Sequence, residues 1–332
     1  MAITAPQSGP DLLSDLLAGD ALRTSAIASF LMASPWGLEV PHFGPALLYA
    51  VVEGNLALQM EGWPICHAAS GDVLLLPRGA SHTVGSAADA PARHILELFE
   101  SQGVRAWRPG ERADAPIQIE ASGAGPVCRF LVVLLDFQDS GPNSLRANLP
   151  EQIYLDMAEN RLAPWLQPAV ESIVAGLAQG RMGYVALSTK LAELVFIDTL
   201  SNVLLLRPEA TSGWLRAMAD PRLARLLAEL NRRLADSWTI QGMSRVAGMS
   251  RSSFAATFTR LAGQTPFAYL TGARMRVAAA RIASGRSSVK QAAHALGYAS
   301  EKAFSVAFKR SMGRSPGALK PKPSAADHWS VG

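Results

Sequence analysis

The chain has 332 residues, a formal net charge of +4 and only two cysteines, Cys66 and Cys128. Neither cysteine belongs to a Cys-x-x-Cys motif, the first residues do not resemble a signal peptide, and no uninterrupted apolar run reaches the ~20 residues of a membrane helix. These features exclude disulfide-stapled and membrane-spanning classes of protein, and they predict a cytoplasmic chain with reduced thiols and no membrane partner.

The mild net charge hides two oppositely charged parts. Residues 1–213 contain 12 Lys and Arg against 22 Asp and Glu, a net charge of −10, whereas residues 214–320 contain 18 against 4, a net charge of +14. A strongly basic segment of this size is typical of a module that binds a polyanion such as DNA. Binding to a membrane surface is the alternative, and it is less favoured because the basic residues are spread over several short predicted helices.

Short apolar runs with frequent turn residues occupy most of the acidic part. A short amphipathic turn or helix is predicted at residues 11–17. After it, Pro and Gly punctuate the chain from about residue 26 to 137, which predicts an all-β barrel or sandwich, with helices as the alternative for the longer runs. The runs lie at residues 46–52, 56–60, 73–76, 94–99 and 127–135.

One stretch of this region resembles the second sequence motif of the cupin family. Gly71-Asp72, an apolar run, a Pro77-x-Gly79 turn and His82 follow one another in the cupin order. The resemblance implies a barrel whose mouth holds a ligand, and it points His82 into that mouth beside His42. The candidate lining residues of a small-molecule pocket are Trp36, His42, Tyr49 and His82.

The same residues argue against a metal centre and against an enzyme. Metal-dependent cupins use two neighbouring His and a Glu in the first motif and a further His in the second. Here His42 has no neighbouring His, and His94 is the only other one nearby. Zinc and iron sites normally take three protein ligands. We therefore expect no metal, no cofactor and no catalytic residue, and a pocket that binds an organic molecule.

Helices are predicted between the barrel and the basic part. Gly141-Pro142-Asn143 ends the β region, and apolar residues at spacings of three and four fill residues 166–177 and 187–204. Residues 207–213 contain Pro, Ser and Gly, which predicts a linker.

The basic part contains the same segment twice, fifty residues apart. Ser, Phe, Phe, Arg, Gly and Pro recur at equal offsets in residues 250–266 and 300–316. In each copy a Ser can cap a helix, two Phe at positions i and i+4 form a buried face, and a Gly ends the helix. Two units are too few for a solenoid, so the repeat predicts a tandem pair of small helical modules.

Each copy follows a second short helical stretch and a tight turn. A small residue, Ser244 or Ala293, precedes Gly248 or Gly297 by a three-residue spacer, and the capped helix follows. The small residue lets two helices cross closely, and Gly adopts a backbone conformation that other residues resist. The pattern predicts two helix-turn-helix modules, each presenting its second helix to the major groove of DNA; a plain helical hairpin is the alternative.

Residues 219–320 resemble the DNA-binding domain of AraC-type transcription regulators. The most similar stretch runs from Gly297 to Pro316, and residues 263–270 match the first module. Trp36–His42 and Glu53-Gly54 resemble the sensing domain found ahead of some of these DNA-binding domains. The resemblance implies double-stranded DNA and a small-molecule effector as partners, a homodimer formed through the helical region, and RNA polymerase as a partner of an activator. Helices that pack only on their own barrel are the alternative to the dimer.

The chain departs from this family at two positions, one in the second helix of each helix-turn-helix module. Members often carry a long polar residue two positions before the second Phe, where this chain has Ala256 and Val306. Such short side chains cannot form bidentate hydrogen bonds, although they can contact a thymine methyl group. The base-reading candidates are Arg251, Ser252 and Lys302, with the short residues Ala255 and Ser305 beside them, and the phosphate-anchoring candidates are Arg260, Lys309, Arg310 and Arg314.

The prediction for the whole chain is an α+β protein. Residues 1–140 are expected to form a cupin-like sensing domain, 141–213 a helical dimerisation region with a linker, 214–320 a double helix-turn-helix domain, and 321–332 a tail. The predicted function is that of a sequence-specific transcription regulator, by family resemblance an activator, controlled by an effector in the barrel. The alternative is an effector-independent DNA-binding regulator whose barrel serves only for dimerisation.

Overall fold

Two compact units make up the chain, which the computed structural model describes at residues 13, 22–105, 113, 117–137, 144–156, 165–179 and 182–319. The first unit contains residues 17–138 and 149–210, and the second contains residues 1–16, 139–148 and 211–332. Most of the predicted turn or helix at 11–17, the Gly141-Pro142-Asn143 turn and the predicted tail at 321–332 lie outside the described residues.

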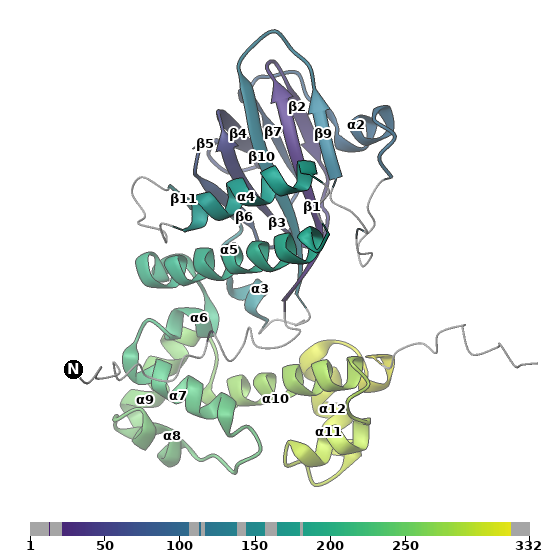
Figure 1. Ribbon diagram of the computed structural model, residues 1–332. Helices are drawn as coiled ribbons and strands as arrows, with labels where there is room; N and C mark the ends of the chain where they lie inside the picture. Colours follow the sequence, from purple (N-terminus) through teal and green to yellow (C-terminus); the bar gives the residue numbers. More distant parts are fainter. Residues whose placement is uncertain are drawn as a thin grey trace, which may run out of the picture. The chain divides into compact units, whose positions relative to one another are not determined.

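Two β-sheets form the body of the first unit (Figure 1). The larger sheet has the strand order β11-β6-β3-β10-β1-β9, and the smaller has the order β5-β4-β7-β2-β8. Their apolar side chains pack together in a core cluster. The larger sheet contains β1 (Leu22–Ala33), β3 (Ala46–Glu53), β6 (Val73–Leu76), β9 (Ile117–Ala121), β10 (Val127–Phe137) and β11 (Ile153–Leu155); the smaller contains β2 (Gly37–Val40), β4 (Asn55–Gln59), β5 (Cys66–Ala69), β7 (His82–Gly85) and β8 (Arg93–His94).

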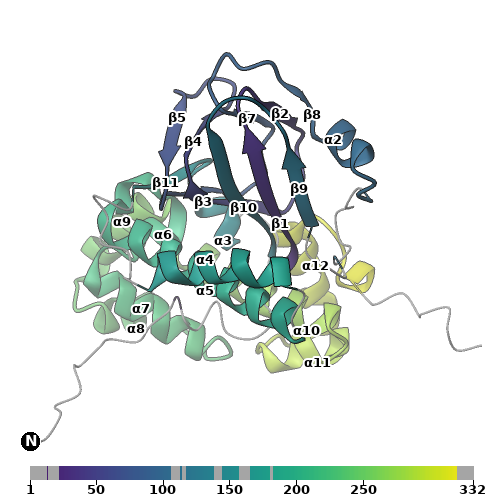
Figure 2. The ribbon, with the colours of Figure 1, turned by 45° about the horizontal axis from the view of Figure 1, so that its top comes forward.

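Strand β10 lies in the middle of the larger sheet, which explains its long apolar run. It pairs antiparallel with β1 on one side, where Phe130 lies opposite Phe30, and with β3 on the other. The sheet is covered on its outer face by helices α4 (Leu166–Gln179) and α5 (Tyr184–Leu206) (Figure 2). A strand that is buried on both faces needs apolar residues at consecutive positions. The predicted β fold is confirmed, with strands at the runs 46–52, 56–60, 73–76 and 127–135.

The apolar run at 94–99 forms a helix, so the prediction of a strand there was wrong. Helix α2 spans Ile95–Ser101, and only Arg93–His94 is extended. The His94 side chain caps the helix, because its Nδ1 accepts a hydrogen bond from the Leu96 backbone N–H at 3.3 Å. Ile95, Leu98 and Phe99 are buried, and their spacing is that of one helical face.

Strand β11 lies in a region that the sequence indicated to be helical. It adds to the edge of the larger sheet, with Tyr154 opposite Leu74 of β6. The Tyr154 hydroxyl donates to the Asp72 carboxylate at 2.8 Å, a contact between residues 82 positions apart. Because this strand has three residues and depends on a distant partner, the local sequence gives little sign of it.

The two long helices of the first unit confirm the helices predicted at 166–177 and 187–204. They pack against each other, and α5 also packs on β1. At the end of β10, the Phe137 ring lies 5.5 Å from the Phe196 ring of α5. A short 3-10 helix, η1 (Pro208–Ala210), follows α5. None of the helices in the described residues is long and apolar enough to cross a membrane.

Short helices form the second unit, and several of them begin at a capping side chain. The hydroxyls of Ser250 and Ser300 accept hydrogen bonds from backbone N–H groups three residues ahead. Gly263 and Gly313 end the same two helices with φ angles of 65° and 73°. The helices are α3 (Leu145–Asn148), α6 (Gly213–Ala217), α7 (Pro221–Arg232), α8 (Ile240–Val246), α9 (Arg251–Ala262), α10 (Pro266–Ala283), α11 (Val289–Ala295), α12 (Glu301–Met312) and the 3-10 helix η2 (Pro316–Leu319).

The second unit contains two helix-turn-helix modules, as the repeat predicts. Helix α8 leads through a tight turn into α9, α11 leads into α12, and α10 connects the two modules (Figure 1). The same backbone hydrogen bond closes both turns, from Met249 N–H to Ser244 O at 2.9 Å and from Tyr298 N–H to Ala293 O at 3.0 Å. The small residues Ser244 and Ala293 are buried where the helices cross.

The second unit begins before its first module. Trp214 of α6 is fully buried, and its ring lies 6.5 Å from the Tyr269 ring of α10. The backbone N–H of Ser212 donates to the Asn148 carbonyl at the end of α3, at 3.0 Å. Helices α3 and α6 are therefore part of the packed helical unit.

Candidate nucleic-acid interface and barrel cavity

Helices α9 and α12, the second helices of the two modules, are held in place by buried pairs of phenylalanines. Phe254 and Phe258 in α9, and Phe304 and Phe308 in α12, have no exposed surface. The ring centroids are 5.8 Å apart in the first pair and 5.5 Å apart in the second. The two phenylalanines of a pair lie one helical turn apart, on the helix face that packs into the unit. The opposite face of each helix is therefore directed outward. We refer to α9 and α12 as the recognition helices.

The outward faces of the recognition helices carry most of the residues that are predicted to contact DNA. Residues 251–260 and 301–310 show the same order of buried, half-buried and exposed positions. Ala255 and Ser305 are only half-buried, because each follows the first buried Phe directly. The exposed candidates are Arg251, Ser252, Arg260, Lys302, Lys309 and Arg310, with Arg314 just beyond α12.

The helical unit has few acidic residues that could neutralise the Lys and Arg side chains of the recognition helices. Residues 214–320 contain 4 Asp and Glu. Asp220, Glu229 and Asp236 all form ion pairs with arginines at α7 and its C-terminal end, namely Arg222, Arg232 and Arg233. Within the described residues, the Lys and Arg side chains of the recognition helices form no such pair. Their charge is available to phosphate groups.

Glu301 and Val306 are exposed on α12 but do not belong to the predicted base-reading or phosphate-anchoring residues. Glu301 occupies the place that Arg251 has in the first repeat. Val306 is 65% exposed on the outward face, one turn from Lys302 and one turn from Arg310. Alignment of the two repeats places both residues on the outward face, so the sequence contained this signal. The first turn of α9 carries Arg251 with no acidic residue, whereas the first turn of α12 carries Glu301 beside Lys302, so the two helices differ in what they offer to DNA.

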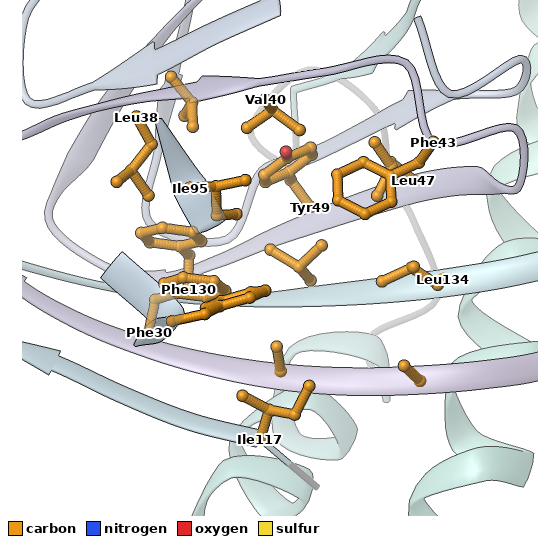
Figure 3. A pocket seen from close by; sticks show the side chains of 15 residues that line it. Phe30, Leu38, Val40, Phe43, Leu47, Tyr49, Ile95, Ile117, Phe130 and Leu134 are labelled. Carbon is orange, nitrogen blue, oxygen red and sulfur yellow. The ribbon is translucent and has the colours of Figure 1, made fainter. Parts of the chain in front are cut away.

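A cavity of about 40 Å³ lies inside the barrel, between the two sheets (Figure 3). Strands of both sheets contribute to its wall, and helix α2 adds Ile95 and Phe99. Among the residues that the structure describes, all the lining side chains are apolar except that of Tyr49. The lining residues are Ala26, Ala28, Phe30, Leu38, Val40, Phe43, Leu47, Tyr49, Val84, Ile95, Phe99, Ile117, Phe130, Val132 and Leu134.

The structure brings three of the four predicted pocket residues to the cavity region and leaves one outside. Tyr49 lines the cavity. Trp36 lies behind the wall, where its ring stacks on Phe130 at 5.4 Å, and His82 lies behind Tyr49. The expectation that His42 points into the barrel mouth is corrected, because His42 is exposed in the loop after β2. The lining phenylalanines escaped sequence analysis because they are scattered over distant segments.

Tyr49 and His82 form a buried, neutral hydrogen-bonded pair. The Tyr49 hydroxyl lies 2.6 Å from His82 Nε2, and His82 Nδ1 lies 2.7 Å from the Ala80 carbonyl oxygen. Because a carbonyl only accepts, Nδ1 carries the proton and Nε2 accepts from the tyrosine. Burial lowers the pKa of His82 to about 4, although the bond to Ala80 opposes this, and burial raises the pKa of Tyr49. Both groups are uncharged at neutral pH.

The cupin-like motif has a structural role at this wall. Gly79 has a φ of 60°, and a Cβ there would overlap the Pro45 carbonyl oxygen. The Gly79 carbonyl accepts a hydrogen bond from the Phe43 N–H at 3.1 Å. The Pro-x-Gly turn thus fixes the loop that carries Phe43, a lining residue, and it leads directly into His82. Among the described residues there is no group of three or more His, Cys, Asp and Glu that could hold a metal ion.

Comparisons with known protein families and sequences agree with this two-part architecture. Residues 11–204 match the family described as Cupin, and residues 243–321 match the family described as Helix-turn-helix domain. An AraC-like transcription regulator of Streptomyces antibioticus is 31% identical, over 94% of this chain and 99% of that relative. The HTH-type transcriptional regulator AlkR of Acinetobacter baylyi is 26% identical, over 85% of this chain and 89% of that relative.

Among solved structures, the DNA-binding domain of AdpA in complex with a target DNA is 29% identical in sequence. The likeness covers 29% of this chain and 86% of that one, with a TM-score of 0.27.

Proposed function

Because the chain belongs to the AraC-type family of sequence-specific DNA-binding transcription regulators, and carries a cupin domain ahead of its helix-turn-helix domain, we propose that a small-molecule effector bound inside the barrel controls its DNA binding. The protein is a regulator and not an enzyme. The observation that carries the proposal is the cavity between the sheets, which is lined by side chains from both of them. Coupling between an effector site and a DNA site is typically worth about 1–3 kcal/mol.

We expect His82→Ala to alter the response to effector and to leave the DNA affinity of the effector-free protein unchanged. The substitution removes the acceptor of the buried Tyr49 proton, so the one polar group at the cavity is left unpaired. The measurement is a DNA-binding titration with and without effector, and His42→Ala is the matched control because His42 is exposed. If the effector changes the DNA affinity of His82→Ala and of His42→Ala by the same factor, the cavity is not the effector site. That result would favour a barrel that serves only for dimerisation.

For the DNA site, we propose that the two ends of the recognition helices have different roles. Arg251, Ser252 and Lys302 lie in the first turns, from where a side chain reaches base edges when the helix enters the major groove. Arg260, Lys309, Arg310 and Arg314 lie at or beyond the last turns and are the proposed phosphate anchors. Ala255 and Ser305 are half-buried, which limits them to short contacts.

Substitutions of two proposed base-reading residues and of one proposed phosphate anchor test this division. Lys302→Ala is expected to change the preference among operator variants by about 1–3 kcal/mol at one base pair, and Arg251→Ala is expected to do the same at another. Arg310→Ala is expected to weaken binding to all sequences about equally. Affinities for a panel of single-base operator variants measure both effects. Equal behaviour of all three proteins would show that the division is wrong.

Val306 is a further proposed contact of α12, because it presents an exposed apolar surface between basic neighbours. Valine can pack on the methyl group of thymine. Replacing individual thymines of the operator by deoxyuridine removes only this methyl group. We expect one such replacement to weaken binding of the unmodified protein and to have a smaller effect on Val306→Ala, whose side chain is shorter. Equal sensitivity of the two proteins at every thymine would exclude this contact.

The remaining partners follow from the proposed regulation. We propose a homodimer through α5, whose exposed leucines include Leu187, Leu194 and Leu205, because exposed apolar groups on one helix are typical of protein contacts. Leu194→Glu should shift the sedimentation coefficient of the protein towards that of a monomer. We further propose activation through contact with RNA polymerase, and action in the cytoplasm.

A further inference from the structure

The barrel cavity has walls of almost pure hydrocarbon. In the described part of the chain, 15 side chains line it; none of these is charged, and only that of Tyr49 carries a polar atom (Figure 3). The apolar side chains come from both sheets and from α2, so they would contact a bound ligand on opposite sides. Cavities lined in this way remain dry, since water inside them would lack hydrogen-bond partners.

The Tyr49 hydroxyl, the one polar group among the described lining side chains, already forms a hydrogen bond within the protein. The Tyr49 hydroxyl donates its proton to His82 Nε2 at 2.6 Å, and the other ring nitrogen is fixed by the Ala80 carbonyl at 2.7 Å. Tyr49 therefore has no proton to donate to a ligand anion. The oxygen keeps one free lone pair, which can accept at most a single hydrogen bond from a ligand hydroxyl.

Among the described residues, no positively charged side chain lines the cavity to attract an anion. The histidine behind Tyr49 is neutral, because burial disfavours its protonated form. A carboxylate that entered would lose its hydration and gain neither a cation nor a donor from the described lining side chains. An apolar molecule of the same size would instead leave water and gain dispersion contacts with the walls.

We propose that the cavity binds a small, uncharged, hydrocarbon-like molecule and rejects organic anions of the same shape. This inference rests on the proposed effector function and specifies the ligand class of that site. The cavity volume is about 40 Å³, which is smaller than the ~150 Å³ of an engineered apolar cavity that binds benzene. The proposed ligand is therefore small, and a single ring enters only if the apolar side chains of the wall move apart.

Toluene and benzoate are the matched probes, because they differ chiefly in the carboxylate. Trp36 is a natural reporter, since its ring stacks at 5.4 Å on Phe130, which lines the cavity. We expect toluene to change the Trp36 fluorescence of the full chain and to raise its melting temperature. The Trp36→Phe protein identifies the signal of this residue among the seven tryptophans. Benzoate is expected to bind at least about tenfold more weakly, and benzyl alcohol is expected to resemble toluene.

A cavity-filling substitution shows where the probe binds. Ala28→Leu places three more carbon atoms in the cavity from β1, and it should abolish the toluene response. Ala33→Leu is the control, because Ala33 lies on the same strand and does not line the cavity. Circular dichroism checks that both proteins are folded. If Ala28→Leu does not fold, Val84→Ile adds a single methylene group from the opposite sheet and takes its place.

The outcomes separate the ligand class from the effector function. Benzoate binding as tight as toluene binding, lost in Ala28→Leu, would overturn the ligand class and leave the effector site intact. A lack of toluene binding by the folded full chain would also overturn the class. Toluene binding at the cavity with no change in DNA affinity would support the class and contradict the effector function.

Discussion

Replacement of Phe308 by Ala is expected to destabilise the second helix-turn-helix module by about 3–5 kcal/mol and to abolish DNA binding. Phe308 has no exposed surface and packs beside Phe304 at a ring distance of 5.5 Å. Truncation would leave a cavity under the recognition helix α12 and remove what fixes the direction of its outward face. Urea denaturation followed by circular dichroism measures the loss of stability, and a DNA titration of the same protein measures the loss of binding.

The matched control for this experiment is Phe267→Ala. Phe267 is 44% exposed at the start of α10, so its truncation should cost much less stability and leave DNA binding in place. A Phe308→Ala protein that is as stable as the control and still binds DNA would mean that α12 does not pack through its phenylalanines.

The affinity of the helical unit for DNA is expected to fall steeply with salt. If it makes about six phosphate contacts, the slope of log affinity against log salt is near −5, which corresponds to a loss of about a thousandfold between 50 and 200 mM. A fragment of residues 211–320 is suited to this measurement because it includes the buried Trp214, which a fragment starting at 219 would lack. The full chain serves as the reference for the fragment.

Two substitutions make the salt measurement specific. Arg310→Ala should reduce the slope by about one, since it removes one proposed phosphate contact. Arg222→Ala should leave the slope unchanged, because Arg222 is already paired with Asp220 at 2.7 Å. A slope near zero for the unmodified fragment would contradict binding through phosphates.

The helical unit was predictable from the sequence because its signals are local. Ser250 and Ser300 cap helices that start one residue later, and each buried pair of phenylalanines lies within one helical turn. The repeat then predicted both modules at once. Helix α2 was missed although its signal is equally local: Ile95, Leu98 and Phe99 have helical spacing, but the run is short and follows a β region.

The barrel cavity was less predictable because it depends on contacts between distant segments. Phe30 and Phe130 stack at 4.9 Å through strand pairing that no local pattern indicates. The pairing of Tyr49 with His82 has the same origin, and the sequence identified both residues without indicating that each satisfies the other. His42 was misplaced because a motif position alone does not decide which way a loop side chain points.

The most direct test of an effector-controlled regulator is a measurement of the coupling in both directions. The affinity of the full chain for operator DNA is measured with and without saturating toluene, and the affinity for toluene is measured with and without operator DNA. Thermodynamic linkage requires the two ratios to be equal, and we expect a factor of about 5–150 that disappears in Ala28→Leu. A ratio of one in both directions, in a protein that binds both toluene and DNA, would contradict effector control through the barrel.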